Sequence, residues 1–194
     1  GKDLLCRIVE NAELAAERQI AVCQDTGMSV VFMEIGQDVH VKGSIAEAVN
    51  EGVRQAYEEG YLRKSVVADP LDRKNTKDNT PAIIHYDLVA GEQIKIAVMP
   101  KGFGSENMSA IKMLKPSDGV EGVIDFVLET VVKAGSNPCP PIIVGIGIGG
   151  TMEKAALLSK KALLRPLDVS NSSPYYKELE ELLSSGKKLS VRDM

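Results

Sequence analysis

The sequence of 194 residues contains no block of five or more like charges and no long hydrophobic run. Its formal net charge is -4 and its isoelectric point lies near 5.3, so a nucleic-acid partner has little support. The longest apolar stretches, such as 141–148, fall far short of the roughly 18 residues that span a bilayer, and no membrane association is expected. The start, Gly1–Leu4, leads into an amphipathic segment and does not resemble a signal peptide.

Cysteine is scarce as well. Three cysteines, an odd number, argue against a disulfide framework and leave metal ligation, catalysis or plain burial. We therefore expect a reducing, cytoplasmic location. With 44% hydrophobic and 26% charged residues, the composition is that of an ordinary globular protein, and one domain with an appended tail is the simplest expectation.

Periodicity predicts an α/β fold. Apolar residues recur at helical spacing in three segments: 4–18, 44–60 and 118–134. Asp3 is placed to cap the first helix, and Ser44-x-x-Glu47 forms a capping box at the start of the second. Short apolar runs predict strands at 30–35, 82–86 and 94–99. The last two are separated by an Ala90-Gly91 turn that favours a hairpin.

The second half of the chain adds one more predicted strand. Residues 142–148 form a continuous apolar run, typical of a strand buried on both faces. Together these elements predict a single α/β domain with a mixed β-sheet flanked by helices, over 1–166. A polar tail, 167–194, follows and contains a short helix at about 175–183.

Four segments combine glycine, polar side chains and cysteine in patterns that could carry chemistry: 22–27, 69–81, 101–107 and 137–151. The first presents a thiol, an amide, a carboxylate and a hydroxyl on one turn, although Asp25-Thr26-Gly27 could also simply make the turn. The polar loop 69–81, taken alone, is more typical of a solvated loop. Cys23 and Cys139 are far apart in the sequence, so any metal site must be assembled by the fold. His40 and His85 lack a nearby nucleophile motif and are expected to be structural.

The glycines of the fourth segment also satisfy a dinucleotide-binding pattern. Gly145, Gly147 and Gly150 match G-x-G-x-x-G between a predicted strand and a predicted helix. The strand that should end in an acidic residue about 20 positions on is missing, because a helix runs into Arg165-Pro166 there. A dinucleotide-binding oxidoreductase therefore stays as an alternative, as does a non-catalytic subunit that binds a partner.

Taken jointly, five segments resemble the class I fumarate hydratase family, which includes the tartrate dehydratases, and most closely its α subunit. The matching segments are 22–27, 62–65, 75–82, 101–107 and 139–151. The resemblance implies the N-terminal fold of that family and a hydro-lyase that hydrates fumarate to malate, with tartrate dehydration as the alternative. It also implies a 4Fe-4S cluster, a fumarase-type β subunit or C-terminal domain, a small dicarboxylate substrate, and a homo- or hetero-oligomer.

The resemblance further implies roles for individual residues. Cys23 and Cys139 would be two of three cluster ligands, and Gln24, Asp25 and Thr26 would be catalytic, with Asp25 a general acid or base. Arg63 would pair with a substrate carboxylate. Substrate contacts would also come from the glycine-rich segment: Lys101, Gly102, Gly104, Ser105 and Asn107.

The sequence also departs from the family pattern. The family's third cluster cysteine lies downstream of the matching region, and Cys6, inside an amphipathic helix, is expected to fill the core instead. The chain is therefore expected to be an incomplete catalytic domain that is inactive without the rest of the enzyme.

Overall fold

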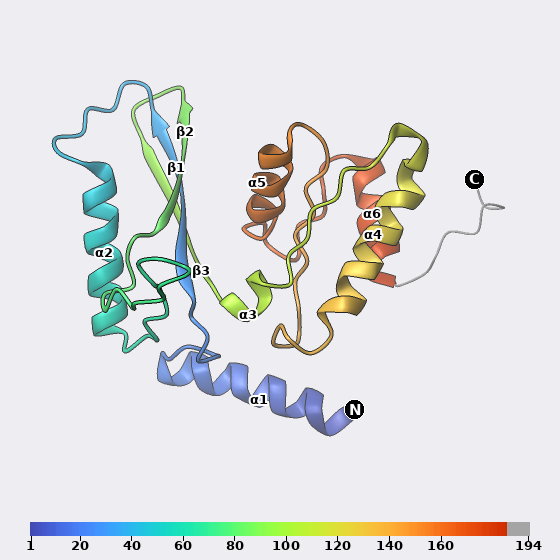
Figure 1. Ribbon diagram of the computed structural model, residues 1–194, viewed down its shortest axis with the longest axis horizontal. Coiled ribbons are helices and arrows are strands. Elements are labelled where there is room, and N and C mark those ends of the chain that lie inside the picture. Colours follow the sequence, from blue (N-terminus) through green and yellow to red (C-terminus); the bar gives the residue numbers. More distant parts are fainter. Residues whose placement is uncertain (186–194) are drawn as a thin grey trace. The chain divides into compact units, whose positions relative to one another are not determined.

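The most apolar strand of the chain occupies the centre of its sheet. In the computed structural model, which describes residues 1–185, β1 (Met28–Gly36) lies between β2 (Ile83–Val89) and β3 (Ile94–Lys101) (Figure 1). β1 is parallel to β2 and antiparallel to β3. Four consecutive β1 residues, from Val30 to Met33, are buried, as expected for a strand covered on both faces. The predicted α/β class with a mixed sheet is confirmed.

The predicted hairpin between β2 and β3 is wrong, because β1 separates these two strands. The end of β1 forms hydrogen bonds with the residues that connect β2 to β3. The Gly36 amide donates to the Gln93 carbonyl, and the Gln37 amide donates to the Val89 carbonyl. A Cβ atom on Gly36 would lie 2.2 Å from the Gly91 carbonyl oxygen. The local turn signal was outweighed by the long-range pairing that buries the more apolar strand.

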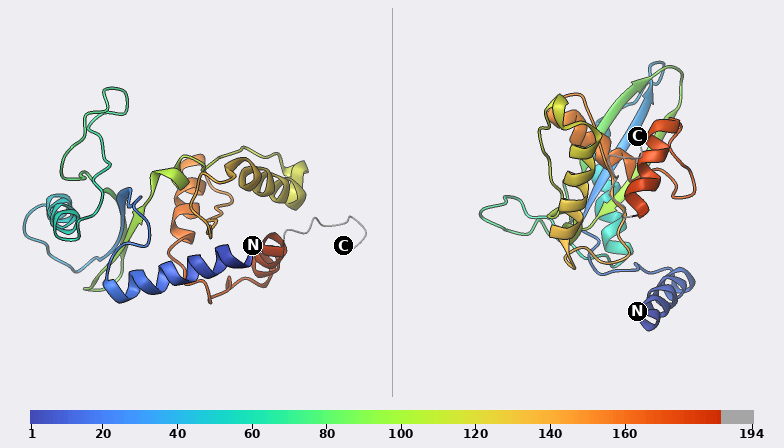
Figure 2. Two further views of the ribbon diagram at one scale, coloured as in Figure 1. Left: turned by 90° about the horizontal axis from the view of Figure 1, so that it is seen from below. Right: turned by 90° about the vertical axis from the view of Figure 1, so that its right-hand side faces the viewer.

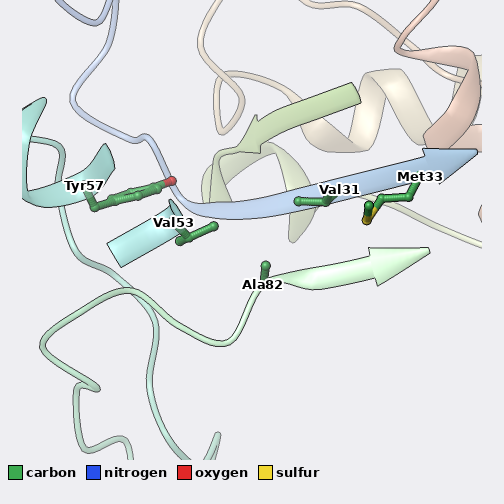
Figure 3. Packing of buried hydrophobic residues seen from close by; sticks show 5 residues of the cluster. All are labelled: Val31, Met33, Val53, Tyr57 and Ala82. Atoms are coloured by element: carbon green, nitrogen blue, oxygen red, sulfur yellow. The ribbon is translucent and has the colours of Figure 1, made fainter. Parts of the chain in front are cut away.

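One face of the sheet is covered by α2 (Ile45–Glu59). The helix begins as predicted, with the Glu47 amide donating to Ser44 Oγ over 3.2 Å. Figure 3 shows Val53 and Tyr57 of α2 in one cluster with three residues of the sheet and its approach: Val31, Met33 and Ala82. Burying each large apolar side chain of this kind contributes roughly 1.5–3 kcal/mol. This core fixes the position of Tyr57, whose hydroxyl group serves the candidate site.

Between α2 and β2 the chain makes a long excursion that contains no helix and no ladder longer than a single bridge, Val67 to Asn75 (Figure 2). The first part of this loop is solvated, as predicted, since residues 68–75 are exposed. Its last part is not, because Asn79 is completely buried.

The N-terminal helix α1 (Lys2–Arg18) matches the predicted segment but not its predicted details. Gly1 is the N-cap residue, and Asp3 lies in the first turn, where its charge favours the helix dipole. Cys6 is exposed, so its assignment to the core is wrong. The reason is that Ala15 alone is buried on this helix, while Leu5 and Val9 stay more than half exposed.

Contacts divide the chain into two compact units, Gly1–Phe103 and the residues from Gly104 onward. The short helix α3 (Phe103–Glu106) lies at this boundary, and the second unit continues with η1 (Pro116–Asp118), α4 (Gly119–Ala134), α5 (Met152–Ala162) and α6 (Pro174–Ser185). The predicted helices at 118–134 and 175–183 are confirmed as α4 and α6, which contact each other. None of the helices within residues 1–185 has the length and apolarity needed to cross a membrane. The predicted domain limits, 1–166 and 167–194, stay a prediction.

The predicted buried strand at 142–148 is absent. The segment lies along α5 without pairing, since a Cβ on Gly145 would fall 2.1 Å from the Ser159 carbonyl oxygen and one on Gly147 2.0 Å from that of Ala155. The glycines therefore allow close backbone contact with a helix in place of a neighbouring strand. The larger residues of the run, such as Ile143 at 58%, are exposed and not buried.

Candidate active site

The turn that carries Cys23 is held against the end of β3 by two glycines. Gly27 has a φ of +55°, and a Cβ there would lie 1.8 Å from the Lys101 carbonyl oxygen. A Cβ on Gly102 would lie 2.9 Å from the Asp25 carbonyl oxygen and 3.1 Å from its carboxylate Oδ2. Any larger residue would separate the two segments. Turn and strand end therefore form one compact structure at the base of the sheet.

The turn presents a thiol and a carboxylate within a few ångströms of backbone N–H groups. The Phe103 amide donates to Asp25 Oδ1 over 3.3 Å, and the Asp25 amide donates to Cys23 Sγ over 3.5 Å. Both side chains are half-buried, whereas Gln24 is exposed and its Oε1 accepts from Cys23 Sγ at 3.5 Å. The turn therefore holds the Cys23 sulfur, an atom of the type that binds metals, close to the Asp25 carboxylate.

Thr26 links this turn to the segment that bears Arg63. The Thr26 hydroxyl donates to the Arg63 carbonyl oxygen over 3.2 Å, and Thr26 is 9% exposed. The Arg63 side chain is exposed and forms no ion pair with any residue in the described part of the chain. The hydroxyl of Thr26 thus has a structural partner, and its catalytic role stays a prediction.

Tyr57 supports the turn from α2. Its hydroxyl donates to the Thr26 carbonyl oxygen over 2.9 Å, and the residue is 2% exposed. Burial raises the pKa of Tyr57 above its ordinary value, so the phenol stays protonated and remains a hydrogen-bond donor. Tyr57 lies in the helical segment 44–60 that the apolar spacing predicts, but the sequence gave no indication of this role.

Asn79 lies in the matching segment 75–82, but the sequence gave it no role in the site. Its Oδ1 accepts from the amides of Ser65 and Val66, at 2.7 and 2.9 Å, and its Nδ2 donates to the Gly27 carbonyl oxygen over 3.0 Å. It adopts a φ of +61°, which asparagine tolerates better than most residues. Its position in a polar loop concealed it, because nothing local distinguishes a buried asparagine from a solvated one.

The neighbouring Asp78 fixes the end of the same loop. Its carboxylate accepts from the amide and the hydroxyl of Thr80, at 3.0 and 2.8 Å, and from Arg54 Nε at 3.3 Å. The backbone and side-chain hydrogen bonds from Thr80 lower the pKa of Asp78 to about 2. The loop that contains Asn79 is therefore anchored to α2 as well as to the turn.

The first unit thus brings together seven of the predicted site residues: Cys23, Gln24, Asp25, Thr26, Arg63, Lys101 and Gly102. The other four belong to the second unit. Gly104 and Ser105 lie in α3, Asn107 follows it in the chain, and Cys139 is an exposed residue after the buried Pro138.

An iron-sulfur cluster requires several cysteine sulfurs gathered at one place. No three His, Cys, Asp or Glu side chains gather into a metal-binding group anywhere in residues 1–185. Cys23 supplies a sulfur atom, the donor type that iron-sulfur clusters use, and the Asp25 amide donates a hydrogen bond to it within the turn. The fit is therefore that of one preformed ligand, and the complete ligand set stays a prediction.

The glycines at 145–150 and the helix α5 that follows them do not form a dinucleotide-binding site. Gly145 and Gly147 contact the backbone of α5, as described above, and no strand precedes the loop. At the start of α5, the Glu153 carboxylate accepts from the Thr151 hydroxyl at 2.5 Å, which places a negative charge where a pyrophosphate would bind. Two of the three glycines thus have a packing explanation.

Comparison with known proteins gives one consistent family. Residues 1–190 match the family described as Fumarate hydratase (Fumerase). A protein of Methanocaldococcus jannaschii named "Putative L(+)-tartrate dehydratase subunit alpha" is 48% identical over 202 aligned positions, covering 100% of this chain and 70% of that protein. The L(+)-tartrate dehydratase subunit alpha of Escherichia coli strain UTI89 is 34% identical, and that of Shigella boydii serotype 4 is 33% identical. Each of these two alignments covers 96% of this chain and 62% of the relative.

The chain belongs to the fumarate hydratase family. It spans less than two thirds of the length of the two enterobacterial relatives.

Proposed function

We propose that this chain is the α-subunit part of a hydro-lyase that adds water to, or removes water from, a small dicarboxylic acid. The single observation that carries the proposal is the turn at 23–27, where a thiol, a carboxylate and an amide are held beside the Arg63 segment and beside Lys101 and Gly102. Family membership supports the reaction class. Hydration of fumarate to malate is the first candidate reaction.

Dehydration of tartrate is the second candidate. It is favoured by the names of the relatives from M. jannaschii, E. coli and S. boydii, each of which is called a tartrate dehydratase subunit. Both substrates carry two carboxylates on a four-carbon chain, so the same residues could bind either.

Each residue has a chemical task in this proposal. The guanidinium of Arg63 can hold a substrate carboxylate with two parallel hydrogen bonds, which a lysine cannot do. The Asp25 carboxylate, oriented by the Phe103 amide, acts as general acid or base on the proton that is moved. Gly102 lets the chain approach the turn closely, and Lys101, Gly104, Ser105 and Asn107 would add substrate contacts.

Cys23 and Cys139 would hold a 4Fe-4S cluster in this proposal. When bound, such a cluster supplies an open iron that acts as a Lewis acid on the hydroxyl of the substrate. The described residues contribute the sulfur of Cys23 in a turn of defined shape, with the Asp25 amide directed at it. A third ligand is not assigned.

A partner subunit is part of the proposal as well. The relatives are named as alpha subunits, which supports assembly with a β subunit or an equivalent domain. That partner would complete the binding of the dicarboxylate.

The test is an anaerobic activity assay of the complete α subunit assembled with its partner, with fumarate and with L(+)-tartrate as separate substrates. We expect Asp25→Asn, which keeps the shape of the side chain, to lower kcat roughly 100-fold or more, because a proton-transfer group is removed. Asp38→Asn, an exposed control beyond the end of β1, should leave kcat unchanged.

The arginine gives an independent test. Arg63→Lys should raise KM roughly tenfold or more, since the bidentate contact with a carboxylate is lost. Arg73→Lys, in the exposed part of the loop between α2 and β2, should have no effect. Full activity of both Asp25→Asn and Arg63→Lys would refute the proposed site, and absence of turnover with either substrate in the wild type would refute the proposed reaction.

A further inference from the structure

Asn79 connects two segments whose residues Asp25 and Arg63 act on one substrate in the proposed function. One is the turn at 23–27, reached through the Gly27 carbonyl oxygen. The other is the segment after Arg63, reached through the amides of Ser65 and Val66. In the sequence these groups lie 52, 14 and 13 residues from Asn79, so no local turn could bring them together.

The chemistry of this contact requires asparagine. The side chain is 0% exposed, and its amide uses its oxygen as a double acceptor and its nitrogen as a donor at the same time. Aspartate would keep the acceptor but place a second oxygen against the Gly27 carbonyl oxygen. Alanine would leave two buried amide donors without a partner and would be strained at a φ of +61°.

A second buried group acts on the same turn from another direction. The Tyr57 hydroxyl donates to the Thr26 carbonyl oxygen, one residue before the carbonyl that Asn79 binds. Two adjacent carbonyls of the turn are therefore fixed by two side chains from different elements. A turn that only had to reverse the chain would not need this.

We propose that Asn79 is a positioning residue that holds the Cys23–Gly27 turn and the Arg63 segment at a fixed separation, with Tyr57 as the second anchor of the turn. The catalytic consequence rests on the proposed function, because it assumes that Asp25 and Arg63 act on one substrate. The structural part does not depend on that assumption. Misplacement of a reacting group by about 1 Å can cost roughly 100-fold in rate, so such an anchor matters for catalysis.

The structural part is tested by hydrogen-deuterium exchange on the full chain without any cofactor. In Asn79→Asp, we expect the peptide that covers 20–29 to exchange at least about tenfold faster, while the Ser65 and Val66 amides keep their acceptor and their protection. The matched control is Asn75→Asp in the same loop, because the Asn75 side chain bonds to backbone atoms of Lys64 and Lys77 and not to the turn. The peptide that covers 20–29 should exchange at the wild-type rate in that control.

Tyr57→Phe is the second variant, in case Asn79→Asp does not fold. It removes one hydroxyl and should speed exchange in 20–29 by a few-fold, whereas Tyr61→Phe, at an exposed position, should not. Uniformly faster exchange over α2 and all three strands would show a general loss of stability and overturn the proposal. Unchanged exchange at 20–29 in both variants would also overturn it.

The catalytic part is tested in the assembled enzyme by combining Asn79→Asp with Arg63→Lys. If Asn79 acts by placing Arg63 relative to the turn, the double variant should lose much less kcat/KM than the product of the two separate losses. Losses that multiply would overturn this part. If the wild type shows no turnover, the proposed function fails, and the exchange experiment alone decides whether Asn79 holds the turn.

Discussion

The two segments that carry the proposed cluster ligands, Cys23 and Cys139, are held in different ways. The turn around Cys23 is fixed by hydrogen bonds from the buried side chains of Asn79 and Tyr57, and by the close approach of Gly27 in the turn to Gly102 after β3. The segment after Cys139 lies on α5 through Gly145 and Gly147, and its large apolar residues are exposed. Cys23 is half-buried, whereas Cys139 is exposed.

This difference indicates which of the two segments has its shape fixed by contacts within its own unit. Buried polar contacts define one conformation, because leaving any of them unmade costs about 1–3 kcal/mol. The contact of Gly145 and Gly147 with α5 also requires a particular backbone geometry, but it does not fix the orientation of any side chain. We therefore expect the turn at 23–27 to keep its shape without a partner, and the segment after Cys139 to depend more on what surrounds it in the complete enzyme.

The largest effect is expected at Gly27. Gly27→Ala should destabilise the first unit by about 3 kcal/mol or more, since the new Cβ meets the Lys101 carbonyl oxygen at 1.8 Å and the φ of +55° is strained. Gly43→Ala is the control, because Gly43 also has a positive φ but a Cβ there would have nothing within 4 Å. It should cost only about 1 kcal/mol. Urea denaturation measures both, and equal losses would mean that the turn does not depend on contact with β3.

A smaller effect is expected where the other segment contacts α5. Gly147→Ala should cost about 2 kcal/mol, because its Cβ would meet the Ala155 carbonyl oxygen at 2.0 Å and the helix backbone has to shift. Gly149 has a φ of +85° and open space around it, so Gly149→Ala reports the backbone strain alone. It should lower the stability by about 1 kcal/mol. Thermal denaturation of the two variants separates contact from strain. A Gly147 variant as stable as wild type would show that this segment is not held on α5.

The smallest effect is expected at Asp78, which fixes the loop beside Asn79. Asp78→Asn should cost about 1 kcal/mol at pH 7, less than the pKa shift alone would give, because solvent screens a carboxylate that is 30% exposed. The folded pKa of about 2 lies below the unfolded value, so this stability is present above about pH 4 and is lost as the pH falls toward 2.

Urea titrations at pH 7 and pH 2.5 measure this dependence. The difference between wild type and Asp78→Asn should shrink at the lower pH. A difference that stays constant would show that ionised Asp78 does not stabilise the loop.

Local patterns predicted local structure well. The capping box at Ser44 and the apolar spacing of α4 gave those helices, and the apolar run of β1 gave the central strand. The hairpin and the strand at 142–148 failed because strand pairing is decided by competition across the whole fold. An apolar run with two glycines fits a helix contact as well as a sheet.

The candidate site divides in the same manner. The motifs at 22–27 and 101–107 were both identified from the sequence. The structure places the turn at 23–27 against Lys101 and Gly102. The segment 75–82 was identified as a motif, but the role of Asn79 could not be predicted, because its burial comes from contacts far away in the sequence. Cys6 was assigned to the core from its amphipathic helix, but that helix leaves most of its apolar face exposed.

The most direct test of the proposed site is the iron content of cysteine variants. The complete α subunit with its partner is reconstituted anaerobically with iron and sulfide, and bound iron is counted in Cys23→Ser, Cys139→Ser and Cys6→Ser. We expect the first two to lose most of their iron and Cys6→Ser to keep the wild-type amount. Wild-type iron in Cys23→Ser, or a loss confined to Cys6→Ser, would contradict the proposed site.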